Sequence, residues 1–112
     1  MNKPLNELAK RVHHLAKEKG FWAGWYSNQY GPHYPRELHL AVKLALVHAE
    51  VSEALEALRK EGVEAHGFRE ELADILIRVL DIAGAVGMDV DSEVDSKHEV
   101  NVGRPLLHGK RF

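Results

Sequence analysis

The sequence contains no cysteine, which excludes disulfide bridges and thiolate metal sites. It also has no apolar run that approaches the roughly 20 residues needed to cross a bilayer. The first 20 residues, MNKPLNELAKRVHHLAKEKG, carry charges throughout and lack the apolar stretch of a signal peptide. We therefore expect a soluble, cytoplasmic protein without a membrane partner.

Positive and negative charges are nearly balanced. The chain has 15 Lys and Arg against 17 Asp and Glu, a formal net charge of -2. Because a large nucleic-acid-binding surface usually shows as a basic excess, no nucleic-acid partner is expected. The 112 residues, 45% of them hydrophobic, fit a single domain over residues 1–112. Its core would be small, so oligomerisation is a natural way to complete it.

Apolar residues recur at helical spacing along most of the chain, and the period-two alternation typical of strands is missing. The pattern predicts four helices. The first begins near Pro4 and ends before Gly20, and the others cover about residues 36–59, 68–86 and 92–102. The sequence therefore predicts an all-α domain, a four-helix bundle.

Asp, Gly and Pro mark the boundaries of these helices. Asp89 or Asp91 can cap the last helix by accepting a hydrogen bond from a free backbone N–H, and Gly103 and Pro105 end it. The segment FWAGWYSNQYGPHYP, residues 21–35, is rich in aromatic residues and turn formers. It is predicted to be a loop.

Two pairs of carboxylates recur at one spacing on the second and third helices. Glu50 and Glu53 lie three positions apart in HAEVSE, as do Glu71 and Asp74 in EELAD. Residues at this spacing share a helix face, so antiparallel packing would bring the four carboxylates together at the rim of the bundle. Their mutual repulsion would be relieved by a hard divalent cation such as Mg²⁺ or Mn²⁺. The common alternative for each pair is a solvated acidic face.

The apolar stripes of these two helices are predicted to be their core faces, with the carboxylates displaced to one edge. Glu56, Glu70 and Asp81 are interpreted as solvated residues or outer helpers of the carboxylate site. The stripes are Leu40, Leu44, Val47, Val51, Leu55 and Leu58 on the second helix, and Leu72, Ile75, Val79, Ile82 and Val86 on the third.

With these motifs, the chain resembles a MazG-like member of the all-α nucleoside triphosphate pyrophosphatases. That superfamily is recognised by an ExxE pair followed, after a connector, by ExxD, which here are EVSE and ELAD. The stretches KEKGFW, LALVHAEVSEALEALRK, EELADILIRVLDIAGAVGMD and RPLLHGKRF also resemble the family. The likeness extends from about Leu5 to Phe112.

The resemblance implies Mg²⁺-dependent hydrolysis of a nucleoside triphosphate to the monophosphate and pyrophosphate, in the service of removing unwanted nucleotides. It implies that Glu50, Glu53, Glu71 and Asp74 hold the metal, with Mn²⁺ as a substitute. Metal ions would neutralise the phosphates and acidify the attacking water. The candidate catalytic residues are Glu53, which would orient or deprotonate this water, and Glu50.

Three polar residues near the C-terminus are candidates for phosphate contacts. Lys97, Asn101 and Arg104 follow i, i+4, i+7 spacing and would share one face of the last helix. By spacing alone they would be a surface stripe, but the resemblance gives a Lys and an Asn of this helix substrate-facing roles. Arg78, one turn beyond Asp74, is a further candidate for contact with the phosphates or the base, and its alternative is an ion pair with Asp74 or Asp81.

Trp22 is the candidate for stacking on a nucleotide base. The resemblance places an aromatic residue after the first helix in this role, and Trp22 in GFW matches it. The alternative is that the aromatic residues of this segment plug one end of the bundle.

Other functions stay open at this point. Within the superfamily, they are a dUTP or dCTP hydrolase and a phosphoribosyl-ATP pyrophosphohydrolase. Outside it, the chain could be a non-catalytic helical interaction module whose carboxylates flank a dimer interface. An extra apolar edge on the helices can be buried against another chain. That edge includes Ala45, Leu46, Ala57 and Ala85. The resemblance implies a homodimer or homotetramer, with a homodimer as the minimum.

Overall fold

The computed structural model describes residues 2–26 and 35–112. These residues form helices and no strand, which confirms the all-α prediction. The elements are α1 (Pro4–Glu18), α2 (Ala23–Tyr26), α3 (Arg36–Glu61), α4 (His66–Val86), α5 (Val90–Val102) and the 3₁₀ helix η1 (Leu106–Gly109).

The four predicted helices are α1, α3, α4 and α5, whose ends differ from the expected ones by only a few residues. The short helix α2 was not predicted, because it lies in the aromatic segment expected to be a loop. The rest of that segment up to residue 34 lies outside the described residues. No helix among the described residues has both the length and the apolar character needed to cross a membrane.

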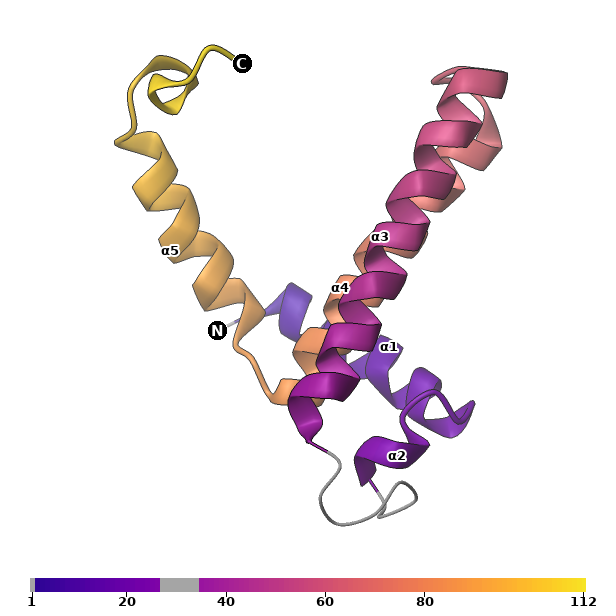
Figure 1. Ribbon diagram of the computed structural model, residues 1–112. Coiled ribbons are helices and arrows are strands. Elements are labelled where there is room, and N and C mark those ends of the chain that lie inside the picture. The colour runs from indigo at the N-terminus through magenta and orange to yellow at the C-terminus, as the bar shows by residue number, and fades with distance from the viewer. Residues whose placement is uncertain (1, 27–34) are drawn as a thin grey trace.

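Helices α3 and α4 form an antiparallel hairpin, and α1 packs against α4 (Figure 1). Helix α5 packs against the start of α1 and diverges from the hairpin, so that the molecule has the shape of a V. Its principal extents are 47 × 37 × 29 Å. Within the described part of one chain, the four long helices therefore do not close into a single bundle.

The contact between α1 and α4 is close because one residue of α4 has no side chain. A Cβ atom built on Gly84 would lie 2.7 Å from His13 Cβ and 2.9 Å from the Ala9 carbonyl oxygen. Glycine is therefore needed at this crossing. The buried core around it consists of Ala9, Leu80, Ala83 and Val90, with Leu5, Leu8 and Val12 packed at its edge.

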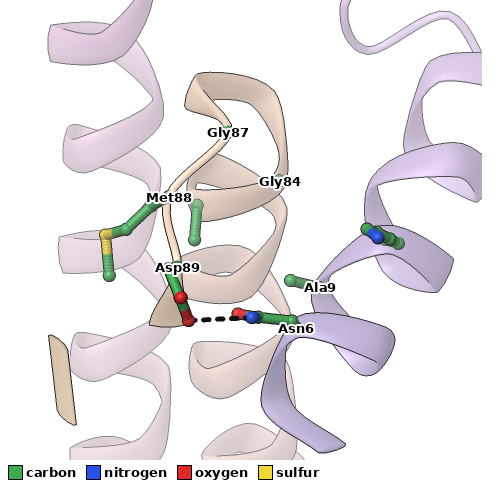
Figure 2. A pocket seen from close by; sticks show the side chains of 8 residues that line it. Asn6, Ala9, Gly84, Gly87, Met88 and Asp89 are labelled. Carbon is green, nitrogen blue, oxygen red and sulfur yellow. Dashed lines mark hydrogen bonds between the residues drawn. The ribbon is translucent and has the colours of Figure 1, made fainter. Parts of the chain in front are cut away.

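Reciprocal hydrogen bonds join the beginnings of α1 and α5. Asp89 caps α5 by accepting a hydrogen bond from Ser92 N at 3.2 Å. This confirms one of the two predicted alternatives, Asp89 or Asp91. Asp91 caps α1 instead, since it accepts from Asn6 N at 2.8 Å. Asn6 returns the contact through its amide, which accepts from Val90 N at 2.6 Å and donates to Asp89 at 2.9 Å (Figure 2). Both helix starts are thereby satisfied, and their relative orientation is fixed.

The predicted core stripe of α3 is mostly exposed, and only Leu40 and Val47 of its six residues are half-buried. Leu44, Val51 and Leu55 are 54%, 48% and 57% exposed, whereas the half-buried or buried residues include Glu50 and Ala54. The helix is thus rotated so that the carboxylate edge, not the leucine stripe, faces α4. The physical reason is that α3 carries apolar residues around much of its circumference, so its sequence does not determine one core face.

The predicted stripe of α4 is also largely open. Leu72, Val79 and Val86 are 49%, 45% and 48% exposed, while Leu80 and Ala83 are buried. The α3–α4 hairpin therefore presents apolar side chains to the outside on both of its helices.

Candidate metal centre

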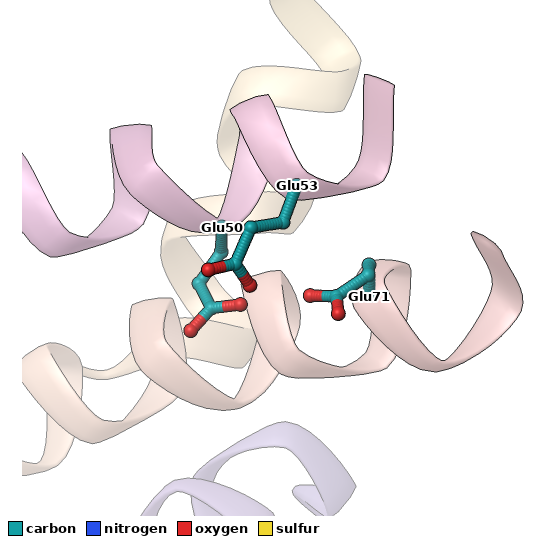
Figure 3. Close-up of side chains that lie close together, drawn as sticks. All are labelled: Glu50, Glu53 and Glu71. Carbon is teal, nitrogen blue, oxygen red and sulfur yellow. The ribbon is translucent and has the colours of Figure 1, made fainter. Parts of the chain in front are cut away.

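Three carboxylates from two helices meet on the α3–α4 hairpin. Glu50 and Glu53 come from α3 and Glu71 from α4 (Figure 3). One oxygen of each lies within 4.8 Å of the oxygens of the other two. The spacing of three residues puts both α3 carboxylates on the side that faces α4, and the antiparallel hairpin places Glu71 opposite them.

Part of this carboxylate cluster (Glu50, Glu53 and Glu71) is shielded from solvent. The Glu50 side chain is only 13% exposed. While Glu71 carries no proton, one oxygen of Glu50 and one of Glu71, Oε2 in each case, are buried and have no hydrogen-bond partner among the described residues. Because an unpaired buried carboxylate oxygen is costly, the cluster is chemically incomplete without a proton or a cation. Glu53 is exposed and leaves one side of the cluster open to water.

Arg78 of α4 forms a hydrogen bond and an ion pair with the carboxylate cluster. Its Nε donates to Glu50 Oε1 at 2.8 Å, so the predicted alternative partners, Asp74 and Asp81, are not the ones it pairs with. This hydrogen bond is the main reason that the pKa of Glu50 is held below its usual range.

Glu71 responds in the opposite direction. A hydrogen bond that it donates to Glu50 when protonated, followed by burial and the charge of Glu53, raises the pKa of Glu71 to about 7. Below about pH 7 the cluster therefore holds a proton that an isolated glutamate loses near pH 4.5. A divalent cation is the natural replacement for that proton.

The fourth predicted ligand, Asp74, is half-buried on α4 but is not among the three carboxylates that converge. It lies one turn after Glu71 and one turn before Arg78 on the same helix. The structure thus brings together three of the four predicted metal ligands.

The predicted phosphate-binding residues of the C-terminal region lie elsewhere in the chain. Lys97 and Asn101 are on α5, and Arg104 follows its end. Since α5 diverges from the hairpin, these residues do not line the carboxylate cluster of their own chain (Figure 1). Arg104 contacts His108 at 3.1 Å, and Asn101 Oδ1 is buried and has no hydrogen-bond partner in the described part of the chain.

Trp22, the predicted stacking residue, is completely buried. Its indole N–H donates to both oxygens of Asp81, at 2.9 and 3.0 Å. The ammonium group of Lys43 lies 4.6 Å from its ring centroid, and the ring of Trp25 packs edge-on at 5.4 Å. Trp22 therefore has no free face in this structure.

Sequence reasoning missed a buried polar cluster around Asp81. His13 Nδ1 lies 2.7 Å from Asp81 Oδ1, and His13 Nε2 lies 2.6 Å from the Tyr26 hydroxyl. Asp81, which was interpreted as a solvated residue or an outer helper, is 15% exposed at its side chain. A signal was present in the sequence, because Asp74, Arg78 and Asp81 follow i, i+4, i+7 spacing along one helix face.

A groove of about 260 Å³ runs between α1 and α4, beside this polar cluster. Its charged lining residues are Lys19, Arg78 and Asp81. Its other lining residues are Val12, Leu15, Ala16, Phe21 and Ile77. A second hollow of about 230 Å³ lies at the junction of α1, α4 and α5, where its polar residues Asn6 and Asp89 bond to each other (Figure 2). That second hollow is remote from the carboxylates, and we assign it a structural role.

The arrangement of Glu50, Glu53 and Glu71 fits a hard divalent cation, because all its donors are carboxylate oxygens and two of them are buried without partners. Comparisons with models of protein families, with curated proteins and with solved structures found no match to this chain.

Proposed function

We propose that this chain is a metal-dependent nucleoside triphosphate pyrophosphohydrolase of the MazG-like kind, which converts a (d)NTP and water to the (d)NMP and pyrophosphate. One observation carries the proposal: Glu50, Glu53 and Glu71 converge from two helices, with two buried oxygens left unpaired. These glutamates belong to the ExxE and ExxD motifs, EVSE and ELAD, whose order along the chain is the basis of the sequence resemblance.

The chemistry needs a cation and a base close together. Mg²⁺ bound at the carboxylates, or Mn²⁺ in its place, would neutralise phosphate charge and make a water molecule more acidic. Glu53 is the residue suited to orient and deprotonate that water, because it is the exposed member of the carboxylate cluster. Glu50 is less suited to this role, since its Oε1 is held by Arg78.

Arg78 is placed to contact the phosphate chain as well as Glu50. Its side chain is 35% exposed, and its Nη atoms have no role in the hydrogen bond that Nε makes to Glu50. A guanidinium group can bind a phosphate through two parallel N–H groups while one further N–H holds a carboxylate. In this proposal Arg78 therefore links metal binding to phosphate binding.

A second copy of the chain would complete the structure. The outer face of the α3–α4 hairpin exposes leucine and valine side chains on both helices, among them Leu44, Leu55, Leu72 and Val79. Covering them in a homodimer or homotetramer would remove this apolar area from water. Lys97, Asn101 and Arg104 could then approach a carboxylate cluster of another chain, which they do not approach in their own.

The decisive experiment is a pyrophosphate-release assay on the common ribo- and deoxyribonucleoside triphosphates, with Mg²⁺, with Mn²⁺ and with chelator. We expect release from at least one nucleotide, only with metal, and loss of at least about a hundredfold in kcat for Glu53→Gln. Glu56→Gln is the matched control, because Glu56 is one turn further along α3 and, among the described residues, forms ion pairs only with Arg59 and Lys60. Circular dichroism of both variants should match that of the wild type.

The exposed apolar face favours one alternative of a different class, a non-catalytic helical interaction module. In that case the carboxylates would only flank an interface. Absence of pyrophosphate release from every nucleotide, together with no effect of Mg²⁺ on thermal stability, would establish this alternative and reject the enzyme.

A further inference from the structure

The α1–α4 groove has the size and the apolar lining that suit a flat ring. Its lining is mostly apolar, with Leu15 and Phe21 from the α1 side and Ile77 from α4. These three side chains are 56%, 61% and 44% exposed, so they are accessible from outside. A volume of about 260 Å³ suits one ring system rather than an entire nucleotide.

The groove adjoins the carboxylate cluster through one residue. Arg78 lies in the groove wall, and its Nε donates to Glu50 Oε1 at 2.8 Å. A molecule whose phosphates are held at Glu50, Glu53 and Glu71 would therefore have the groove within reach on the other side of Arg78. Under the proposed function, the part of the substrate to be placed there is the base.

The polar groups of the wall differ in what they can recognise. Lys19 and Arg78 only donate hydrogen bonds, whereas the carboxylate oxygens of Asp81 accept them. Asp81 is held rigidly, because Trp22 donates to both of its oxygens and His13 lies 2.7 Å from Oδ1. Its Oδ2 accepts only from Trp22 among the described residues, and so it retains acceptor capacity.

We infer that this groove binds the base of the substrate and selects guanine, an inference that rests on the proposed function. Guanine is the common base that presents two adjacent donors, N1–H and the 2-amino group, which can share one acceptor oxygen such as Asp81 Oδ2. Its O6 and N7 are acceptors that a guanidinium group can meet, as Arg does when it reads guanine in DNA. Asp81 would accept from the donor edge, and Arg78 would donate to the acceptor edge through an N–H that neither Glu50 nor the phosphates use.

The other common bases fit this pair of side chains less well. Adenine and cytosine offer one amino group, but its neighbouring ring nitrogen is an acceptor that Asp81 would repel. Uracil and thymine offer a single N–H that is flanked by two carbonyl oxygens. A site built on a fixed carboxylate rejects such edges, because it would leave Asp81 facing another acceptor.

Binding of the two reaction products, dGMP and dIMP, tests the inference without requiring turnover. Hypoxanthine differs from guanine only in lacking the 2-amino group. Calorimetry with Mg²⁺ should show dGMP binding about tenfold or more tighter than dIMP. The Asp81→Asn variant should bind both equally. Equal affinity of the wild type for dGMP and dIMP would overturn the inference.

Asp81→Asn could also unfold the chain, because Asp81 accepts the hydrogen bonds of the buried Trp22. A second variant therefore tests the groove without changing Asp81. Ile77→Trp fills the groove from an exposed position on α4, and we expect it to weaken dGMP binding about tenfold or more while Mg²⁺ binding stays unchanged. Val63→Trp, at an exposed site in the α3–α4 connector, is its control. Unchanged dGMP affinity in Ile77→Trp would place the base elsewhere and would also overturn the inference.

The results separate this inference from the proposed function. Pyrophosphate release without any preference for guanine over hypoxanthine supports the enzyme and rejects the guanine groove. Selective dGMP binding without release from any triphosphate rejects the enzyme and keeps the groove as a guanine-nucleotide site. If a second copy of the chain covers the groove instead, Ile77→Trp will change the oligomeric state and leave dGMP affinity unaltered, which rejects the groove.

Discussion

Arg78 Nε donates a hydrogen bond to Glu50 Oε1 at 2.8 Å, and this contact joins the middle of α4 to the middle of α3. It neutralises the charge of Glu50. The hydrogen bond between Glu71 and Glu50, together with burial and the charge of Glu53, raises the pKa of Glu71 to about 7. The same guanidinium group lies in the wall of the α1–α4 groove. Arg78 thus connects the metal centre, the phosphates and the groove in the function proposed here.

Replacing Arg78 by Met should destabilise the metal-free protein by about 1–2 kcal/mol, because it leaves Glu50 poorly solvated and unpaired. The estimate is below that for a fully buried pair, since Arg78 is 35% exposed. Urea denaturation in chelator measures it. Arg69→Met is the control, because Arg69 pairs with Glu64 at 2.8 Å on the surface and should cost less than about 0.5 kcal/mol. Equal losses in the two variants would contradict a special role for Arg78.

Stabilisation by Mg²⁺ should be larger at pH 8 than at pH 5.5. The folded chain holds the Glu71 proton more tightly than the unfolded chain, since the pKa is about 7 against an ordinary value of 4.5. The contribution of Glu71 to stability is therefore fully present below about pH 4.5 and is lost as the pH rises through about 7. A bound cation replaces the proton, so metal binds best where the proton has left.

Thermal unfolding at both pH values, with Mg²⁺ and with chelator, measures this difference. In Glu71→Gln the side chain no longer titrates, so the metal-free protein should lose that part of its pH dependence and the effect of Mg²⁺ should shrink. The same increase in Tm at pH 5.5 and pH 8 in the wild type would show that Glu71 does not compete with the metal.

Gly84→Ala should destabilise the chain by about 1–3 kcal/mol, because the added Cβ would lie 2.7 Å from His13 Cβ and 2.9 Å from the Ala9 carbonyl oxygen. Neither of these atoms is at the end of a flexible side chain, so α1 must move away from α4. Gly103→Ala is the matched control, since its nearest neighbour would be 3.7 Å away and its φ of -81° suits any residue. Chemical denaturation of the two variants gives the comparison, and equal stability would contradict the close crossing.

Leu55→Glu should convert the proposed oligomer to a monomer while preserving helix content. Leu55 is 57% exposed on the outer face of α3, so burying a charge there in an interface would be strongly unfavourable. Sedimentation velocity gives the oligomeric state, and Arg59→Glu, at an exposed site one turn further, is the control. A wild-type protein that sediments only as a monomer would end the oligomer proposal.

Much of the local structure follows from the sequence. The positions of α1, α3, α4 and α5, the cap at Asp89 and the left-handed end of α4 at Gly87 all depend on neighbouring residues. The convergence of Glu50, Glu53 and Glu71 was predictable for the same reason. Residues three apart share a helix face, and a short connector makes consecutive helices antiparallel.

The tertiary structure decided which way each helix is turned. The sequence of α3 offers apolar residues on more than one side, and the predicted stripe with Leu44 and Leu55 proved to be exposed, while Ala54 is buried. Helix geometry fixes about 100° between successive side chains, but the rotation of the entire helix depends on which neighbour it packs against. The partnership of Arg78 with Glu50, the burial of Asp81 against Trp22 and the divergence of α5 depend on contacts between residues far apart in the chain. The sequence by itself thus determined the helices and the carboxylates they carry, whereas packing between helices determined their surroundings.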